Sequence, residues 1–499
     1  MKKIFIAIAL LLTLAFILAS CGPAADKPND ANGGGAADEN AGGDAAEETK
    51  EQKITHDVPD INFEGYVFTV LDRAGYDGKY WVSVDMYAEA ENGEPINDAV
   101  FRRNRRLEAK FNITIEEIKK EPDLLAFAQK SIMAGDDTFD VLYPFMQNAG
   151  VMIQKGQLVN LYGVPYLSFD KPWWNKTTND SMTVGKKLYC AAGDIAVITN
   201  DSTWAVLFNK ELTKDFGLSD HYQMVKEGKW TLDVLRENSR LVTKDLNGDG
   251  VLTLHEDQWG TIQQHECSYC LFAASGQTVI VKDANDLPTL AFSNDRTVAV
   301  LTKVIDFLSD DTAQIKVDEF AGKYNDIWAE AMNTFIENRG LYAIWPLRAV
   351  PDMRTMEADF GILPLPKYDE AQDTYYSVMQ YNNATVMCIP VSAVNLERTG
   401  AILEAWAAES VDTLTKAYYE INLKGKHSRD EESSAMLDLI LATRVVEQGL
   451  FFNWENLQMF FAGFSQRKQM DFASRYEKIE DKLQKAIAKT VEQILESNN

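Results

Sequence analysis

The sequence predicts an α/β protein with two lobes, and three observations lead to this fold class. Short apolar strands alternate with amphipathic helices in the first part of the chain, at a spacing typical of βαβ units and a parallel sheet. The chain has 499 residues, and the part after residue 57 is long enough for two domains of ordinary size. Its hydrophobic content of 46% is that of a globular protein.

The first predicted elements follow one another in βαβ order. An apolar run at 66–71 predicts a strand, and apolar residues at helical spacing predict a helix over 96–111. Ile96, Val100, Leu107 and Phe111 form the apolar face of that helix, and we expect Arg102, Arg103, Arg105 and Arg106 on its solvent-exposed face. Further strands are predicted at 113–115 and 140–143, and further helices at 124–133 and 148–153.

The ends of the predicted strands indicate where a ligand would bind. In parallel α/β sheets, ligands bind outside the carboxyl ends of the strands. Asp72-Arg73-Ala74 follows the first strand, and Tyr143-Pro144-Phe145 follows the third. We therefore expect Arg73, Tyr143 and Phe145 at the rim of a ligand cleft.

The middle of the chain contains a predicted hairpin at 185–189, a strand leading into a helix at 204–210, and a helix that starts after Thr231, its predicted N-cap. Five strings occur in order: Asp-Val-Leu-Tyr (140–143), Gly-Gln-Leu-Val-Asn-Leu (156–161), Gly-Lys-Lys-Leu-Tyr (185–189), Leu-Phe-Asn-Lys-Glu-Leu (207–212) and Trp-Thr-Leu-Asp (230–233). This order resembles the substrate-binding lipoproteins of bacterial ABC importers, of the sugar-binding type related to maltose-binding protein. The segments 340–345, 359–367 and 397–407 look like later strands and a helix of that family.

The resemblance implies a periplasmic-binding-protein-like fold, in which two α/β lobes are joined by a hinge and close on a ligand. The N-terminal lobe would comprise residues 58–196 and 363–410, and the C-terminal lobe residues 197–362 and 411–499. The chain would cross between the lobes near 194–199 and again near 359–365. A final amphipathic helix, with Tyr476, Leu483 and Ile494 on its apolar face, would pack on the second lobe.

The first 57 residues predict an exported protein that is anchored to a membrane. Lys2 and Lys3 precede an apolar run over 4–18 that is short for a transmembrane helix, so residues 1–20 are predicted to be a signal peptide. Leu18-Ala19-Ser20-Cys21 resembles the bacterial lipobox, which implies acylation of Cys21; an ordinary secreted protein is the alternative. Residues 21–57 would then be the lipidated cysteine and a disordered acidic linker. The protein would face the outside of the bacterial cell membrane.

Charge and cysteine content exclude some functions. The formal charge of −26 argues against nucleic acid and anionic lipid as partners. Cys267-Ser268-Tyr269-Cys270, with His265 just before it, could suggest a redox pair or half of a zinc site. A zinc site requires a second ligand pair at suitable spacing, and the sequence has none, so structural thiols or one local disulfide are predicted.

The segment 245–256 matches the twelve-residue calcium loop at every ligand position. The predicted ligands are Asp245, Asn247, Asp249, Val251 through its carbonyl, Thr253 and Glu256, with Gly250 at the sharp turn. Hard oxygen ligands at this spacing favour Ca²⁺ over softer metals. A solvated turn is the alternative. Gln258-Trp259-Gly260 interrupts the second helix that a signalling EF-hand requires. Sugar-binding proteins of the type that this sequence resembles often carry a similar loop as a structural clamp, and this resemblance implies a structural Ca²⁺ site remote from the ligand.

A sugar receptor combines aromatic platforms with carboxylates, amides and arginines. Trp345 looks like a stacking tryptophan of the maltose-binding type, with a role in the core as the alternative. The residues predicted to bind the ligand are Trp345, Tyr143, Phe145, Arg73, Asp201, Trp204, Gln264 and Arg348.

Together these inferences predict a substrate-binding lipoprotein that captures a sugar or oligosaccharide and delivers it to ABC permease subunits, without catalysis. Its membrane contact would be through the lipid anchor only. Two alternatives stay open. One is a binding protein for a peptide or cationic solute. The other is a secreted carbohydrate-active enzyme, although the sequence contains no nucleophile elbow, HExxH motif or phosphate loop.

Overall fold

The computed structural model describes residues 55–75, 81–120, 124–292, 294–423, 431–467 and 471–497. The predicted signal peptide, Cys21 and most of the predicted linker lie outside the described residues. In the part of the chain that is described, none of the helices combines the length and apolar character that a membrane span requires.

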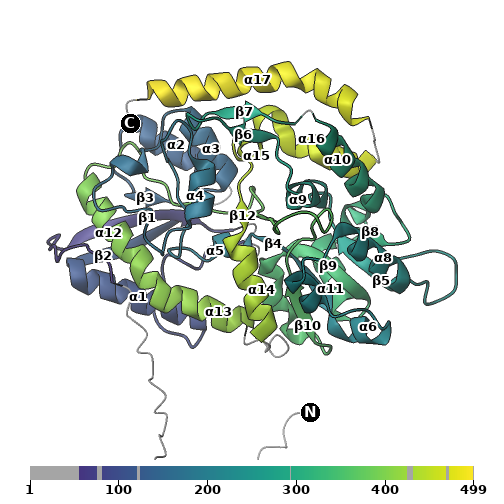
Figure 1. Cartoon of the computed structure of the whole chain (residues 1–499). Coiled ribbons are helices and arrows are strands. Elements are labelled where there is room, and N and C mark those ends of the chain that lie inside the picture. The colour runs from purple at the N-terminus through teal and green to yellow at the C-terminus, as the bar shows by residue number, and fades with distance from the viewer. Residues whose placement is uncertain are drawn as a thin grey trace, which may run out of the picture. The chain divides into compact units, whose positions relative to one another are not determined.

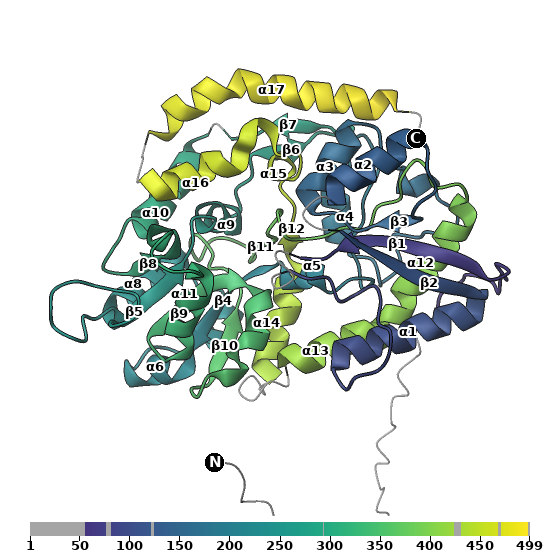
Figure 2. The ribbon, with the colours of Figure 1, turned by 180° about the vertical axis from the view of Figure 1, so that it is seen from behind.

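The first sheet is built from three parallel strands in the order β2-β1-β3, and its elements agree with the predicted βαβ order. Helices α1 and α2 contact this sheet, and Figures 1 and 2 show it beside α1 and α12. The elements are β1 (Tyr66–Arg73), α1 (Pro95–Phe111), β2 (Ile113–Lys120), α2 (Leu124–Ala134), β3 (Val141–Leu142) and α3 (Met146–Gln154).

Two extended segments continue the first sheet beyond β3. Leu142 and Cys388 exchange two backbone hydrogen bonds of 2.9 Å, and Ala191 and Met387 exchange another two of 2.9 Å. The segment around Met387 and Cys388 therefore runs antiparallel to β3, and the segment around Ala191 restores the direction of β3. Between β3 and the segment around Ala191, the chain also forms η1 (Leu161–Gly163), α4 (Lys176–Met182) and the turn of the predicted hairpin, where Val184 pairs with Lys187.

The second sheet has five strands in the order β10-β4-β9-β5-β8. Three neighbouring strands are parallel, β4 runs opposite to them, and β10 restores their direction, which repeats the pattern of the extended first sheet. Its strands are β4 (Trp204–Asn209), β5 (Trp259–Gln263), β8 (Gln314–Lys316), β9 (Gly340–Pro346) and β10 (Phe360–Leu363).

Helices cover both edges and faces of the second sheet, as Figure 1 shows. In chain order they are α6 (Lys210–Asp215), α7 (His221–Lys226), α8 (Leu232–Val242), α9 (Cys267–Ala274), α10 (Asp295–Leu308), η2 (Val317–Phe320), α11 (Ile327–Ile336) and η3 (Leu347–Thr355), with the hairpin β6 (Ile280–Lys282) and β7 (Pro288–Leu290) after α9. Helix α8 begins as predicted, because the Thr231 hydroxyl accepts a hydrogen bond from the Val234 amide.

The chain passes between the two sheets through segments that lie side by side. α5 (Ile198–Asp201) leads from the first sheet into β4, and the returning segment after β10 includes β11 (Ser377–Val378). The Gln380 amide donates to the Ser202 carbonyl at 2.8 Å, which ties the outgoing and returning segments together. β11 also pairs with β12 (Arg444–Val445), a later segment.

The part of the chain after residue 395 is mostly helical and contacts elements of both sheets. Its elements are α12 (Leu396–Ser410), the π-helix η4 (Val411–Thr415), α13 (Lys416–Leu423), α14 (Glu431–Ala442), α15 (Gln448–Phe451), η5 (Trp454–Asn456), α16 (Leu457–Arg467) and α17 (Phe472–Glu496). α17 contacts β7, and it also contacts α3 beside the first sheet, as both views show. The prediction that the final helix packs on the second lobe was therefore incomplete.

The prediction that Arg103 lies on the solvent-exposed face of α1 is wrong. Arg103 is fully buried, and its guanidinium donates to the Ser410 hydroxyl at 3.2 Å and lies 5.1 Å from the centre of the Trp406 ring. The reason is its position: Arg103 follows Val100 by three residues and precedes Leu107 by four, so it lies on the apolar face of the helix. The expectation of four exposed arginines was wrong for Arg103 because it relied on the charge of this residue and not on its position around the helix.

Candidate functional site

A cavity of about 540 Å³, here called the large cavity, lies between elements attached to the two sheets. α4 contributes Thr177, Asp180 and Ser181, and the side chain of its Asn179 is hydrogen-bonded to Ala192, next to the extended first sheet. Tyr269 comes from α9, which follows β5 of the second sheet. The rest of the lining comes from 276–282, Tyr376 and 445–448. The volume falls within the range of small-molecule sites.

A second space, the small cavity, adjoins the large cavity. It measures about 30 Å³ and is lined among others by Trp204, His265, Glu266, Gln380 and Tyr381. This volume holds about one or two water molecules and no sugar ring. Tyr269 lines both cavities, and its hydroxyl lies 3.2 Å from that of Tyr381, so the two tyrosines form the partition between them.

Two buried polar side chains give the large cavity its hydrogen-bonding character. The Glu447 carboxylate accepts hydrogen bonds from the Thr278 hydroxyl at 2.5 Å and from the Val279 amide at 2.8 Å. Burial raises the pKa of Glu447, although these donors act against the rise. The Gln448 amide nitrogen donates to the Ser181 carbonyl at 3.0 Å, while its buried Oε1 has no hydrogen-bond partner in the protein. That oxygen is a buried, unsatisfied acceptor on a residue of the cavity lining.

The small cavity also presents acceptors. Gln380 Oε1 is a buried oxygen that accepts no hydrogen bond from the protein, while Glu266 Oε2 lies 3.4 Å from His265 Nδ1 as an ion pair. Burial raises the pKa of Glu266, while the positive charge of His265 acts in the opposite direction. Because an unsatisfied buried acceptor costs free energy, a hydroxyl or amine donor that reached Gln380 Oε1 would be stabilised there.

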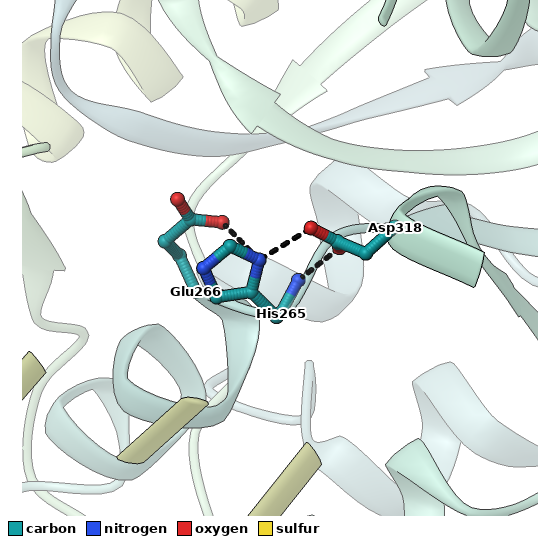
Figure 3. A group of neighbouring side chains, drawn as sticks. All are labelled: His265, Glu266 and Asp318. Atoms are coloured by element: carbon teal, nitrogen blue, oxygen red, sulfur yellow. Dashed lines mark hydrogen bonds and ion pairs between the residues drawn. The ribbon is translucent and has the colours of Figure 1, made fainter. Parts of the chain in front are cut away.

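His265, Glu266 and Asp318 form a cluster at the edge of the small cavity (Figure 3). Their ligand atoms all lie within 4.8 Å of one another, and no other such group of acids, histidines or cysteines occurs among the described residues. His265 Nδ1 is in direct hydrogen-bond contact with an Asp318 oxygen, and the His265 amide donates to the other oxygen at 2.7 Å. In this arrangement the His265 imidazole and the Asp318 carboxylate share a proton.

The two cysteines that follow His265 are not part of this cluster. Cys267 and Cys270 are free, buried thiols, and burial raises the pKa of both well above the usual value. A thiol that is kept protonated is a poor nucleophile and a poor metal ligand. The prediction of structural thiols agrees with this arrangement.

The strand-end residues of the first sheet lie together. The Arg73 guanidinium carbon is 3.5 Å from the centre of the Phe145 ring, and the guanidinium donates to the Trp81 carbonyl at 2.7 Å. Tyr143 is buried, and its hydroxyl has no hydrogen-bond partner in the protein. Arg73 is buried as well, so these groups form a packed layer at the end of β1 and β3.

The predicted ligand-binding residues of the second sheet are also mostly buried. Trp345 is 8% exposed, packs in the core of that sheet and meets the Trp328 ring edge-on at 6.0 Å. Burial raises the pKa of Asp201 to about 6, against the lowering effect of the Arg348 charge. Gln264 is buried directly after β5.

Of the eight predicted residues, only Trp204 lines one of the two cavities. Their roles in binding stay predictions. The cavities add residues that sequence reasoning missed, above all Tyr269, Tyr381 and Gln448. His265 and Glu266 carried a usable signal, because they follow the carboxyl end of β5 directly.

The predicted calcium loop forms the expected succession of turns. The Asp245 carboxylate accepts hydrogen bonds from the amides of Gly248 at 2.7 Å and Gly250 at 2.8 Å, and Gly250 has the positive φ of 80° that the sixth position requires. The Asp249 carboxylate accepts from the Val251 amide at 2.7 Å. The exposed oxygen donors fit Ca²⁺ in chemical type. Among the described residues, however, the ligand atoms of the three acids of this loop are not all within 4.8 Å of one another.

No protein-family model matches the sequence, and no curated protein matches it. Solved structures do match. A cyclo/maltodextrin-binding protein complexed with maltotetraose is 14% identical with a TM-score of 0.53, covering 87% of this chain and 99% of that one. An ABC substrate-binding protein from Listeria monocytogenes in complex with cycloalternan is 13% identical with a TM-score of 0.52, covering 86% and 98%. A maltose/maltodextrin-binding domain from Bdellovibrio bacteriovorus bound to maltotriose is 13% identical with a TM-score of 0.52, covering 86% and 100%.

These matches span nearly the whole length of each solved chain, and they establish the fold. The protein has the periplasmic-binding-protein-like α/β fold that its sequence predicts. The structural neighbours are named as binding proteins. At this level of identity the fold does not identify the ligand, which depends on the residues of the site.

Proposed function

We propose that the protein is an extracellular substrate-binding lipoprotein of an ABC importer, which captures a sugar or oligosaccharide and delivers it unchanged to permease subunits. The large cavity carries this proposal. It joins elements of both sheets, and its lining combines two tyrosines with one unsatisfied amide oxygen, that of Gln448, which are groups that sugar recognition uses. It does so in a fold shared with proteins whose solved structures hold maltotetraose, cycloalternan and maltotriose.

Titration calorimetry tests the proposal with a panel of mono- and oligosaccharides that includes maltotriose, maltotetraose and cycloalternan. We expect one glycan to bind at 1:1 stoichiometry and to be recovered intact. Tyr376→Ala removes a ring from the large cavity and should weaken binding about tenfold, because a stacked aromatic ring contributes roughly 1 kcal/mol beyond its buried area. Tyr87→Ala, a partly exposed tyrosine outside both cavities, is the matched control.

The alternatives give different results in the same experiment. Binding of a peptide or polyamine with no glycan response would favour a carrier of another solute. Steady release of reducing ends would favour an enzyme. Absence of any bound glycan across the panel would contradict the sugar proposal.

We also propose that Cys21 is acylated and that residues 1–20 are removed on export. The supporting observation is the basic and apolar start of the sequence, followed by Leu18-Ala19-Ser20-Cys21. Cells fed a labelled fatty acid should incorporate the label into the wild-type protein. Cys21→Ser should abolish labelling and release the protein from the membrane fraction, because a stable anchor requires the acyl chains. Labelling that persists in Cys21→Ser would rule out this anchor.

The loop 245–256 is proposed to hold a structural Ca²⁺ ion. Its support is the sequence match together with the turns around Asp245 and Gly250. Elemental analysis should find one calcium per chain, and a chelator should lower the melting temperature. Asp245→Ala should remove both effects, while Asp283→Asn, an acid in another exposed turn, should keep them. A chain without calcium and without a chelator effect would leave only a solvated turn.

A further inference from the structure

His265 lies near the carboxyl end of β5 and lines the small cavity. Its ring is held from one side only. Nδ1 faces the carboxylates of Asp318 and Glu266, with Glu266 Oε2 at 3.4 Å (Figure 3). Within the described part of the chain, Nε2 makes no hydrogen bond to the protein. The ring thus has one nitrogen engaged by the protein and one left for a group in the cavity.

Asp318 fixes both the orientation and the protonation of this ring. One carboxylate oxygen accepts from the His265 amide at 2.7 Å, and the other meets Nδ1, so the carboxylate is anchored on the same residue at two points. A carboxylate at Nδ1 keeps a proton on that nitrogen. Nε2 is then a donor when the imidazole is charged and an acceptor when it is neutral.

The charged groups around His265 determine which form dominates. Burial lowers the pKa of His265, and the positive charge of Lys316 acts in the same direction. The hydrogen bond to Asp318 and the negative charges of Glu266 and Asp318 raise the pKa, and they outweigh the lowering effects. Lys316 is itself paired with Glu319, with its Nζ 3.1 Å from the Glu319 carboxylate.

We propose that His265 donates a hydrogen bond from Nε2 to an uncharged oxygen of the bound solute, and that Asp318 is the positioning residue that keeps the imidazole turned and protonated for this contact. The inference rests on the proposed function, because it assumes that a solute enters between the two sheets. It also assumes that hinge opening of the two lobes widens the small cavity, which at about 30 Å³ holds no sugar ring. It adds the kind of group that is recognised at this point: an uncharged hydroxyl oxygen, which accepts from Nε2 of the charged imidazole. Above the pKa of His265 only a weaker, neutral hydrogen bond to the hydroxyl remains.

The first experiment uses the solute-free full chain and does not depend on binding. Nitrogen NMR of histidine-labelled protein follows the five histidines through a pH titration. We expect Nδ1 of His265 to stay protonated throughout and its pKa to lie above that of an ordinary histidine. Asp318→Asn should lower this pKa, and Asp306→Asn, an exposed acid on α10, should leave it unchanged. An unchanged pKa in Asp318→Asn would overturn the positioning role.

The second experiment measures affinity for maltotriose, maltotetraose and cycloalternan, using whichever binds, at pH 5.5 and pH 8.5. The wild type should bind about tenfold more weakly at the higher pH, because a charged hydrogen bond is lost and a neutral one remains. Asp318→Asn should weaken binding about tenfold at pH 5.5. His265→Gln should keep the affinity of the high-pH wild type at both pH values, because its amide donor does not titrate.

The outcomes separate the two proposals. If the wild type binds none of the three glycans, the sugar proposal loses its support, while the NMR titration still decides the role of Asp318. If the wild type binds and both variants match it at each pH, the role of His265 is overturned and the sugar proposal stands. If the wild type bound one Zn²⁺ per chain and Asp318→Asn abolished this binding, the cluster would be a metal site, and the inference would be overturned.

Discussion

Glu404 shows how a single buried carboxylate holds a tryptophan pair in place. It is 2% exposed and accepts hydrogen bonds from the indoles of Trp173 at 3.2 Å and Trp174 at 2.9 Å, and from the Ser168 amide at 3.2 Å. Burial raises the pKa of Glu404, and the three donors act against that rise. Three donors therefore depend on one side chain.

Removal of this acceptor should destabilise the protein strongly. Glu404→Leu leaves buried donors without a partner, and each costs about 1–3 kcal/mol, so we expect a loss of about 3 kcal/mol or more in the free energy of unfolding. Glu404→Gln keeps an acceptor oxygen and should lose less than half as much. Urea unfolding at pH 7 measures both. Equal stability of Glu404→Leu and the wild type would show that water replaces the carboxylate.

For single residues, the sequence predicts which chemical groups lie together better than it predicts how deeply they are buried. The strand-end argument brought Arg73 and Phe145 together correctly, because β1 and β3 are parallel neighbours and their carboxyl ends meet. It did not find Tyr269 or Gln448, which reach the large cavity from a helix after β5 and from α15. Their approach depends on contacts between elements far apart in the chain, and no local pattern records such contacts.

Among the elements, those with strong local periodicity were predicted well. The predicted helix over 96–111 is α1, the strand over 340–345 is β9, and the amphipathic C-terminal pattern is α17. The extended segment around Met387 was missed. Asn382-Asn383 and Pro390 bound it as turn signals, but it pairs with residues about 200 and 250 positions earlier, so its place in the sheet is set only by long-range contacts.

The start of α8 provides a test of local signals. Thr231 caps the helix through its hydroxyl, while the Leu232 amide donates to the Lys367 carbonyl at 2.8 Å. Thr231→Ala should cost about 1 kcal/mol of unfolding free energy, which is the usual contribution of an N-cap, and Thr231→Ser should keep most of it. Thermal unfolding of the three proteins measures the difference. A loss in Thr231→Ser equal to that in Thr231→Ala would assign the effect to the methyl group and not to the cap.

For the molecule as a whole, buried acids gather around α5, the outgoing connection between the two sheets. Asp85 accepts a hydrogen bond from the Ile198 amide at 2.9 Å, and Asp201 is the last residue of α5. Asp194, just before α5, accepts from the Thr415 hydroxyl at 2.9 Å. Burial raises the pKa of Asp85 to about 7 and the pKa values of Asp194 and Asp201 to about 6.

These shifts give the fold a pH dependence of definite sign. The folded state binds the three protons more tightly than the unfolded chain does, so their stabilisation is complete below the ordinary aspartate pKa. It is lost as the pH rises through about 6 to 7, where the folded protein must ionise buried groups. The free energy of unfolding contributed by these groups should therefore fall between pH 5 and pH 8.

Asp85→Asn isolates the largest of these contributions. The amide oxygen can still accept from the Ile198 amide, but the side chain no longer ionises. The variant should gain stability relative to the wild type as the pH rises, by about 2–4 kcal/mol between pH 5 and pH 8, from a shift of about three pKa units. Urea unfolding across this range, with Asp306→Asn as the exposed control, measures the gain. If the pH profiles of Asp85→Asn and the wild type ran parallel, the Asp85 carboxylate would be ionised at no cost, and the acids around α5 would not govern the pH response of the connection.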